Sequence, residues 1–245
     1  MNSERSPARF VLDGHELLPG ISIDPVIFGF HEGQLKILLL EFRDTRLFAL
    51  PGGFVHETEN LDEAARRILA DRTGLRDIYL EQFYVFGDRD RRDAETQRKI
   101  MVSTGTQLDD DHWLLRRFIS IGYYALIDFT QATPTPDALS DSCTWYDLAE
   151  LPPLIFDHSA IVRKALDTLQ KNLDDKLVGL NLLPETFTMA DLQRLYETIL
   201  ARPLQRTNFQ RKMLSLGILE RLEKKMSGGA HKAPYLYRFI SPTTP

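Results

Sequence analysis

The sequence predicts an α+β protein with two domains. Residues 1–183 hold short β-branched and aliphatic runs with a few helical segments among them, which is typical of a strand-rich domain. Residues 184–245 instead predict two short helices and a pair of strands. Charge divides the chain near the same point, since residues 1–184 carry 30 acidic and 20 basic side chains and residues 185–245 carry 5 acidic and 10 basic ones. We therefore expect an acidic body and a basic C-terminal domain, which is typical of a tail that meets a polyanion.

The strands of the first domain follow from its apolar runs. Residues 21–30 and 34–42 are β-branched or aliphatic, and the Gly-containing tetrapeptide HEGQ between them predicts a hairpin. A shorter strand is expected within residues 47–54, closed by Pro-Gly-Gly. Further strands are expected over residues 77–87 and 117–129.

Two helices are predicted in this domain. The first has apolar residues at helical spacing, namely Leu61, Ala64, Ala65, Ile68 and Leu69. Asn60 and Glu63 resemble a capping box at its start, and Gly74 provides the C-terminal stop. The second helix is expected from Asp157, a residue type that favours the N-cap position.

The segment 88–116 is charged and shows little periodicity. We interpret it as a long loop with one helical turn around Trp113. Loops of this length in compact domains are usually functional or disordered. Trp113 is then either a lid residue over a ligand or an anchor that holds the loop on the core. Residues 131–142 are rich in Pro and Ser and predict another surface loop.

Composition excludes several classes of protein. Cys143 is the single cysteine, so an intramolecular disulfide and a Cys-rich zinc site are excluded, and we expect Cys143 to be a buried apolar residue. The longest apolar run, ILLL, is too short to span a bilayer. The first 20 residues lack the pattern of a signal peptide. We expect a cytoplasmic protein that contacts no membrane and needs no metal or cofactor.

The C-terminal domain has the element order of a winged helix-turn-helix. Thr188 and Asp191 cap a first helix with a regular apolar face, and residues 201–205 break it. A second helix follows and ends at Gly217. The segments ILERLEKK and APYLYRFI then predict two strands around SGGAHK. Two helices followed by such a hairpin, the wing, are typical of proteins that bind DNA.

The second C-terminal helix carries the candidate DNA-reading residues. Arg reads guanine, Asn and Gln read adenine, and Lys and Arg neutralise phosphate. The candidates on the helix are Arg206, Thr207, Asn208, Gln210, Arg211 and Lys212, and those at the wing tip are His231 and Lys232. The residues expected to pack on the preceding helix are Phe209, Met213, Leu214 and Leu216. We expect Tyr235 and Tyr237 to pack within the strand and not to stack on bases.

Residues 53–75 match the spacing of the Nudix hydrolase motif, G-x5-E-x7-R-E-U-x-E-E-x-G-U, where U is a bulky aliphatic residue. The matching positions are Gly53, Glu59, Arg67, Leu69, Gly74 and Leu75. The carboxylates that hold Mg²⁺ in the motif are replaced by Ile68, Asp71 and Arg72. Mg²⁺ prefers octahedral oxygen ligation, so we expect no metal site and no catalytic residues here. We expect Glu59 and Arg67 to form a structural ion pair. We attribute Gly52 and Gly53 to turns with positive φ.

Other segments resemble the Nudix-related transcriptional regulators over about residues 20–240. The similar segments are LPGGFV, YLEQFYVFGDRDR, ISIGYYALI, LIFDH, FTMADLQRLYETIL, RTNFQRKMLSLGIL and HKAPYLYRF. The resemblance implies a Nudix-like α/β/α sandwich with a mixed sheet, followed by a winged helix-turn-helix domain. Members bind ADP-ribose or a pentose such as arabinose as effector. The segment 88–116 departs from the family, whose members connect the flanking strands more directly.

The ligand-site candidates lie at strand ends and loops expected to surround the Nudix cleft. Arginine donates to phosphate or sugar hydroxyls, and aromatic faces suit an adenine or a sugar ring. The candidates are Arg43, Arg46, Phe54, His56, Arg117 and Tyr124.

These features predict a DNA-binding transcriptional regulator. Its catalytically inactive Nudix-like domain would sense a small metabolite, ADP-ribose or a pentose, and control binding to operator DNA. We expect a homodimer, because two winged helices match a palindromic site. One alternative is a Nudix-type hydrolase of a nucleoside diphosphate derivative. The other is a module that binds a protein partner through its winged helix.

Overall fold

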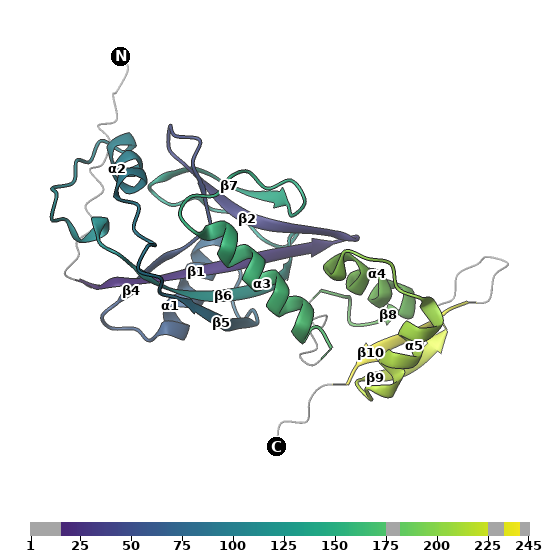
Figure 1. Cartoon of the computed structure of the whole chain (residues 1–245). Coiled ribbons are helices and arrows are strands. Elements are labelled where there is room, and N and C mark those ends of the chain that lie inside the picture. The colour runs from purple at the N-terminus through teal and green to yellow at the C-terminus, as the bar shows by residue number, and fades with distance from the viewer. Residues whose placement is uncertain (1–15, 175–181, 225–232, 241–245) are drawn as a thin grey trace, which may run out of the picture.

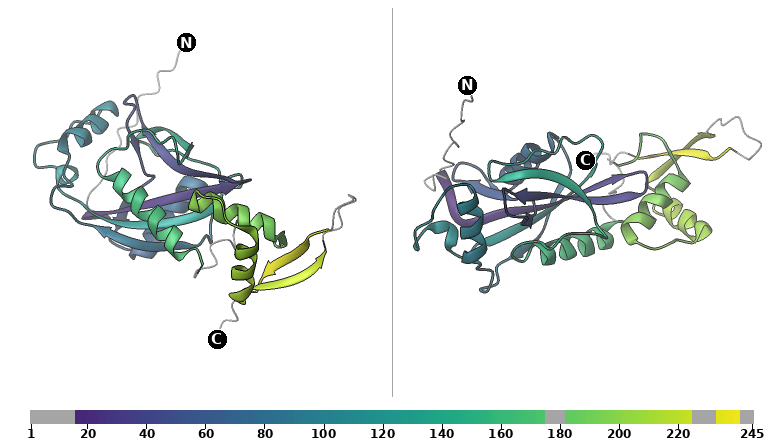
Figure 2. Two further views of the ribbon diagram at one scale, coloured as in Figure 1. Left: turned by 45° about the vertical axis from the view of Figure 1, so that its right-hand side comes forward. Right: turned by 90° about the horizontal axis from the view of Figure 1, so that it is seen from above.

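The computed structural model describes residues 16–174, 182–224 and 233–240. A sheet with helices on both faces forms the larger part, and a smaller group of helices and strands follows at one end (Figures 1 and 2). The elements of the larger part are β1 (Leu17–His31), β2 (Gln34–Phe42), β3 (Phe48–Ala49), β4 (Gly53–His56), α1 (Leu61–Thr73), β5 (Leu80–Phe86), α2 (Ala94–Ser103), the 3-10 turn η2 (Trp113–Leu115), β6 (Ile119–Asp128), β7 (Ser140–Asp147) and α3 (His158–Asn172).

The sheet is mixed, as the resemblance implies. Its main order is β3-β2-β1-β6-β5, with β4 paired to β1 and β7 paired to β2. The central strands β1 and β6 run parallel from the pair Ile21 and Ile119 to the pair Phe30 and Asp128, while the other pairs are antiparallel. The long β1 therefore lies between the start of β4 and the start of β6 at one end of the sheet.

Alternate residues of the central strands face different helices, which makes the larger part an α/β/α sandwich. On one face, Ile23 of β1 and Ile121 of β6 pack in one cluster with Ile68 of α1. On the other face, Val26 and Phe28 pack in one cluster with buried residues of α3. Because both faces are buried, these strands are apolar throughout and lack the alternation of a half-exposed sheet.

Several signals that depend on neighbouring residues are confirmed. Asn60 and Glu63 form the capping box of α1, and Gly74 ends it with a φ of 73°. The hairpin between β1 and β2 turns at Glu32 and Gly33, which have φ values of 47° and 81°. Cys143 is buried, as expected. Among the described residues, no helix is long and apolar enough to cross a membrane.

Two predictions about secondary structure need correction. The segment 88–116 contains the helix α2, which was not expected, besides the predicted turn η2 at Trp113. The helix α2 buries only Ile100 and Met101, so its apolar period is too weak to detect from the sequence. Residues 140–147 form β7, part of which was assigned to the loop 131–142.

The C-terminal part is a winged helix. Its elements are β8 (Phe187–Thr188), α4 (Met189–Leu200), α5 (Arg206–Ser215), β9 (Leu219–Lys224) and β10 (Tyr235–Phe239). Thr188 and Asp191 form the capping box of α4, as predicted. The strand β8 was not expected; it adds a third strand in the order β8-β10-β9. On α5, Phe209 and Met213 are buried, as predicted. The prediction that Leu214 and the C-cap residue Leu216 pack inward is wrong, because these residues are 45% and 39% exposed.

Candidate ligand cavity and nucleic-acid-binding helix

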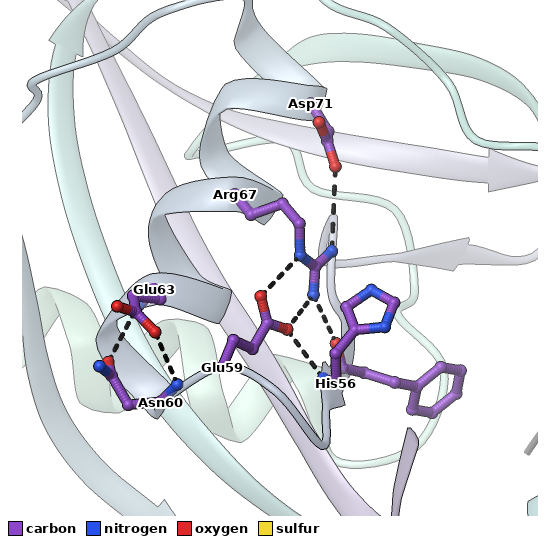
Figure 3. Close-up of polar contacts among 7 residues, drawn as sticks. His56, Glu59, Asn60, Glu63, Arg67 and Asp71 are labelled. Atoms are coloured by element: carbon purple, nitrogen blue, oxygen red, sulfur yellow. Dashed lines mark hydrogen bonds and ion pairs between the residues drawn. The ribbon is translucent and has the colours of Figure 1, made fainter. Parts of the chain in front are cut away.

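An ion pair holds the Nudix-like loop against α1. Arg67 Nε donates to Glu59 Oε2 at 3.0 Å, and Arg67 Nη2 donates to Glu59 Oε1 at 2.6 Å and to the carbonyl of Phe54 at 2.8 Å (Figure 3). The backbone N–H of His56 donates to Glu59 as well. The hydrogen bonds from Arg67 hold the pKa of Glu59 below its usual range. The structural role predicted for Glu59 and Arg67 is confirmed.

The three positions that would carry metal-binding carboxylates are arranged differently. Ile68 is only 2% exposed and lies in the apolar cluster beneath α1. Arg72 forms an ion pair with Asp137 at 3.0 Å. Asp71 is the single carboxylate of the three, and its Oδ2 lies 3.9 Å from Arg67 Nη1. Among the described residues, no group of three His, Cys, Asp or Glu side chains is placed to hold a metal ion.

A cavity of about 170 Å³ lies at the end of the sheet where β1, β4 and the N-terminus of α3 meet. It is lined by Ser22, Asp24, Leu40, Phe42, Ala49, Leu50, Gly52, Gly53, Phe54, Arg91, Asp93, Gln97, Ile100, Leu114, Leu115, Arg116, Phe118, Asp137, Leu139, Ile155, Phe156 and His158. The segment 88–116 supplies several of these residues. It therefore forms one wall of the cavity.

Asp24 and His158 are the buried polar groups of this cavity. Ser120 Oγ donates to Asp24 Oδ2, and Ser22 Oγ lies 3.3 Å from the same oxygen. The backbone N–H of Leu50 donates to His158 Nδ1 at 3.0 Å, so the proton of the neutral ring lies on Nε2. Burial lowers the pKa of His158, against the opposing effect of Asp24 and Asp157. The cavity thus combines a carboxylate acceptor with a neutral imidazole.

Close packing, and not backbone conformation, requires glycine at residues 52 and 53. Neither glycine has a positive φ, so the turn explanation is wrong. A Cβ on Gly52 would lie 2.3 Å from Asp24 Oδ1, and a Cβ on Gly53 would lie 2.9 Å from Ile68 Cδ1. The absence of both side chains keeps the cavity floor next to β1 and α1.

Arg91 ties three separate segments together beside the cavity. Its guanidinium binds both carboxylate oxygens of Asp157, at 2.6 and 2.8 Å. Its Nη1 donates to the carbonyls of Phe86 and Phe118, at 2.9 and 3.1 Å. Asp157 is the N-cap residue of α3 by position, but its side chain makes no capping hydrogen bond. The predicted N-cap position is therefore confirmed, but the carboxylate of Asp157 binds Arg91 and not the helix backbone.

Three aromatic rings meet at the edge of the cavity. The Phe54 ring lies 5.2 Å from that of Trp113 and 5.6 Å from that of Phe118, measured between centroids. The Trp113 and Phe118 rings lie 5.8 Å apart. Phe54 and Phe118 line the cavity, whereas Trp113 packs behind them. Of the two roles left open for Trp113, its position matches the anchor.

Of the six predicted ligand residues, only Phe54 lines this cavity. Arg43 contacts Asp141, and Arg46 is exposed with a φ of 56°. His56 is half-buried at the end of β4, and its backbone N–H donates to Glu59 (Figure 3).

The remaining two candidates also lie outside the cavity. Arg117 is exposed and lines a separate depression, although its neighbour Arg116 lines the cavity. Tyr124 is 1% exposed, and its hydroxyl donates to Glu81 in the core under α3. Sequence reasoning missed Asp24 and His158. A lone acidic residue inside the apolar run ISIDPVIFGF was the available signal for Asp24.

The predicted DNA-reading residues share α5. Arg206, Thr207, Asn208, Arg211 and Lys212 are exposed, and Gln210 is half-buried. Thr207 and Arg211 are each two residues from buried Phe209, so they lie about 200° around the helix from it and point away from the core. Lys212 lies to one side and forms an ion pair with Asp174. His231 and Lys232 lie outside the described residues.

The strand residues near the wing behave as predicted. Tyr237 is 3% exposed and belongs to the core. Tyr235 is half-buried, and the guanidinium of Arg221 lies 3.6 Å from its ring centroid. Both rings are therefore engaged by their own domain.

Comparison with known proteins agrees with this arrangement. The NUDIX domain family matches residues 22–169, and the NrtR DNA-binding winged helix domain matches residues 179–239. A curated relative, the ADPR responsive transcriptional repressor NtrR of Acinetobacter baylyi, is 30% identical over 228 residues, which cover 90% of this chain and 82% of that protein.

Two solved structures are also similar over most of the chain. Shewanella oneidensis NrtR complexed with a 27mer DNA is 28% identical with a TM-score of 0.66, covering 90% of this chain and 93% of that one. Shewanella oneidensis NrtR is 27% identical with a TM-score of 0.67, covering 90% and 94%. This chain therefore belongs to the Nudix-related transcriptional regulators, which join a NUDIX domain to an NrtR-type DNA-binding winged helix domain.

Proposed function

We propose that this protein is a transcriptional repressor whose affinity for operator DNA changes when ADP-ribose binds in the cavity. The observation that carries the proposal is one chain holding a cavity at the Nudix cleft and an outward-facing basic helix in an NrtR-type domain. The relative from Acinetobacter baylyi is named as ADPR responsive, which favours ADP-ribose over a pentose as the effector.

The chemistry of the cavity supports a nucleotide-like ligand. Phe54 and Phe118 offer aromatic faces on which an adenine can stack. Arg116 offers a cation for a diphosphate, and Asp24 offers acceptors for ribose hydroxyls. A free pentose has neither an adenine to fill both aromatic faces nor a diphosphate to pair with Arg116. The placement of each ligand group is part of the proposal.

The arrangement of α1 supports a sensor without hydrolase activity. Ile68 provides no ligand atom, and Arg72 brings a positive charge to a position where the motif has a metal-binding carboxylate. Incubation of the protein with ADP-ribose and Mg²⁺ or Mn²⁺ tests this point, with release of AMP as the readout. We expect no turnover above the rate without protein. Metal-dependent turnover that disappears in Glu59→Gln would overturn the sensor-only role and favour the alternative hydrolase.

Calorimetric titration with ADP-ribose, ADP, ribose and arabinose tests the effector. We expect binding of ADP-ribose and no measurable heat with either pentose. Arg116→Gln should weaken ADP-ribose binding by about tenfold, the loss of one charge-assisted contact. Arg117→Gln is the matched control, because the adjacent arginine lies outside the cavity. Equal effects of the two substitutions would contradict the proposed diphosphate position.

Selection of bound duplexes from a random-sequence pool tests the operator function. We expect an enriched sequence, and a change in its affinity when ADP-ribose is added. An enriched site whose affinity ADP-ribose leaves unchanged would contradict the proposed response. We further propose a homodimer as the working unit. Sedimentation equilibrium with and without the selected duplex tests this, and a monomer bound to a palindromic site would oppose it.

A further inference from the structure

The end of α3 meets the candidate recognition helix α5 through an ion pair. Lys212 Nζ lies 2.5 Å from Asp174 Oδ2. Asp174 directly follows the C-cap residue of α3, which belongs to the NUDIX part, whereas Lys212 belongs to the winged helix. Figure 1 shows α3 running along the sheet toward α4 and α5. A carboxylate at the end of α3 is thus bound to a cation on the candidate recognition helix of the other domain.

We propose that Asp174 competes with DNA phosphate for Lys212 and so lowers the DNA affinity of this protein. The proposal rests on the DNA-binding role of α5. Lys212 lies beside the outward face of α5 and not at its centre, a position suited to a backbone phosphate. While Lys212 is bound to Asp174, it contributes little net charge to that contact.

Two further contacts hold this pair in register. Gln170 Nε2 donates to the carbonyl of Ile199 at 2.9 Å, and the Tyr196 hydroxyl donates to the carbonyl of Leu173 at 3.1 Å. Both join the last turn of α3 to α4. These contacts position Asp174 opposite Lys212, so the pair does not depend on a chance meeting of two long side chains.

The ion pair is also accessible to a competitor. The Lys212 side chain is 52% exposed and that of Asp174 is 36% exposed. Exposed ion pairs are weak and are screened by salt, so a phosphate can displace the carboxylate at modest cost. The pair therefore lowers the affinity for DNA without abolishing binding.

The helix α3 connects the Asp174–Lys212 ion pair to the cavity. His158, the first residue of α3, lines the cavity, and Asp157 before it is bound to Arg91. A helix is stiff along its axis, so a displacement at His158 also moves Asp174. Occupation of the cavity can therefore change the distance between Asp174 and Lys212.

The test measures affinity for a mixed-sequence duplex of roughly 30 base pairs, because phosphate contacts do not depend on sequence. Affinities of the full-length chain are determined across a range of salt concentrations. Asp174→Asn should bind about two- to fivefold more tightly than the unsubstituted chain near 0.1 M salt. Its plot of log affinity against log salt should be steeper by about 0.9, the value for one added phosphate contact. Asp167→Asn, an exposed residue of α3, is the control for the loss of one negative charge.

A double-substitution cycle separates this explanation from a structural one. Lys212→Gln should change DNA affinity little in the unsubstituted chain, and should abolish the gain in the Asp174→Asn chain. Thermal unfolding of each variant shows whether it is folded. Equal effects of Asp174→Asn and Asp167→Asn, or an equal loss from Lys212→Gln in both backgrounds, would overturn the proposal. Absence of salt-dependent DNA binding by the unsubstituted chain would instead overturn the DNA-binding role itself.

Discussion

Arg91 and Asp157 form a bidentate ion pair across 66 residues of sequence, with N–O distances of 2.6 and 2.8 Å. The Arg91 side chain is 8% exposed, and the same guanidinium donates to two backbone carbonyls. A single residue of the segment 88–116 therefore holds the start of α3, the end of β5 and the residue before β6 together. The cavity lies at this junction.

Arg91→Lys should destabilise the protein by about 2–4 kcal/mol. Lysine cannot reproduce a bidentate contact, and it leaves a carboxylate and two carbonyls with fewer donors. Urea unfolding measures the free energy of unfolding. Arg89→Lys is the control, because that side chain is 87% exposed. A loss no larger than that of the control would contradict the role assigned to Arg91.

Arg67→Lys should lower the free energy of unfolding by about 1–2 kcal/mol. The substitution removes the fork that binds Glu59 and the Phe54 carbonyl, but the Arg67 side chain is 34% exposed, so solvent screens part of the loss. ADP-ribose affinity should fall as well, because Phe54 lines the cavity. Arg66→Lys, at an exposed site on the same helix, should leave both quantities nearly unchanged.

Gly52→Ala should destabilise the chain by about 1–3 kcal/mol, the range for overpacking a tight site. The new Cβ would meet both Asp24 Oδ1 and the carbonyl of Ile23, at 2.3 and 2.9 Å. Gly87→Ala is the matched control, because nothing lies within 4 Å of a Cβ there. Thermal unfolding distinguishes the two variants. Equal melting temperatures would contradict the close packing of Asp24 on Gly52.

Stability should decrease as the pH falls below about 6.5. The folded pKa of His158 lies below its usual value because burial disfavours the imidazolium. The unfolded chain therefore binds more protons between the two pKa values, and the stability that is complete above about pH 6.5 is lost on acidification by at most about 1.4 kcal/mol per pH unit from this group. His158→Asn keeps an acceptor for the Leu50 N–H and does not titrate. Its unfolding free energy, measured from pH 7.5 to 5.5, should have a smaller slope; an unchanged slope would assign the effect to other groups.

Arg211→Ala should weaken binding to a selected operator by about 1–3 kcal/mol and relax its sequence preference, as expected for a base-reading arginine. Arg211 is exposed and points away from the core of the domain, and its Nη2 donates to Asn208 Oδ1 of the same helix. Arg163→Ala, an exposed arginine of α3, removes the same charge outside the winged helix. Affinities are compared by fluorescence anisotropy at fixed salt. Equal losses in the two variants would mean that charge alone, and not base reading, explains the effect.

Interactions between residues close together in the sequence could be predicted, whereas those between distant residues could not. The capping pairs Asn60–Glu63 and Thr188–Asp191 join residues three positions apart, so their geometry is visible in the sequence. The helix α2 was missed because it buries only Ile100 and Met101, which gives too weak an apolar period. The prediction that Tyr124 and Arg117 bind the ligand rests on the positions of strand ends, which the sequence indicates. It could not use the directions of their side chains, which the sequence does not indicate. Alternation along β6 turns Tyr124 into the core.

By itself, the sequence determined the two-part organisation, the mixed α+β class, the apolar faces and caps of α1 and α4, and the loss of metal-binding carboxylates at Ile68 and Arg72. These properties depend on residue identity and on spacings shorter than one or two helical turns. Only the tertiary structure decided which residues share the cavity. Asp24, Arg91 and His158 are far apart in the chain, and they meet because β1 pairs in parallel with β6 while α3 crosses the same sheet. The contact of Asp174 with Lys212 likewise depends on how the two domains pack, which no local pattern encodes.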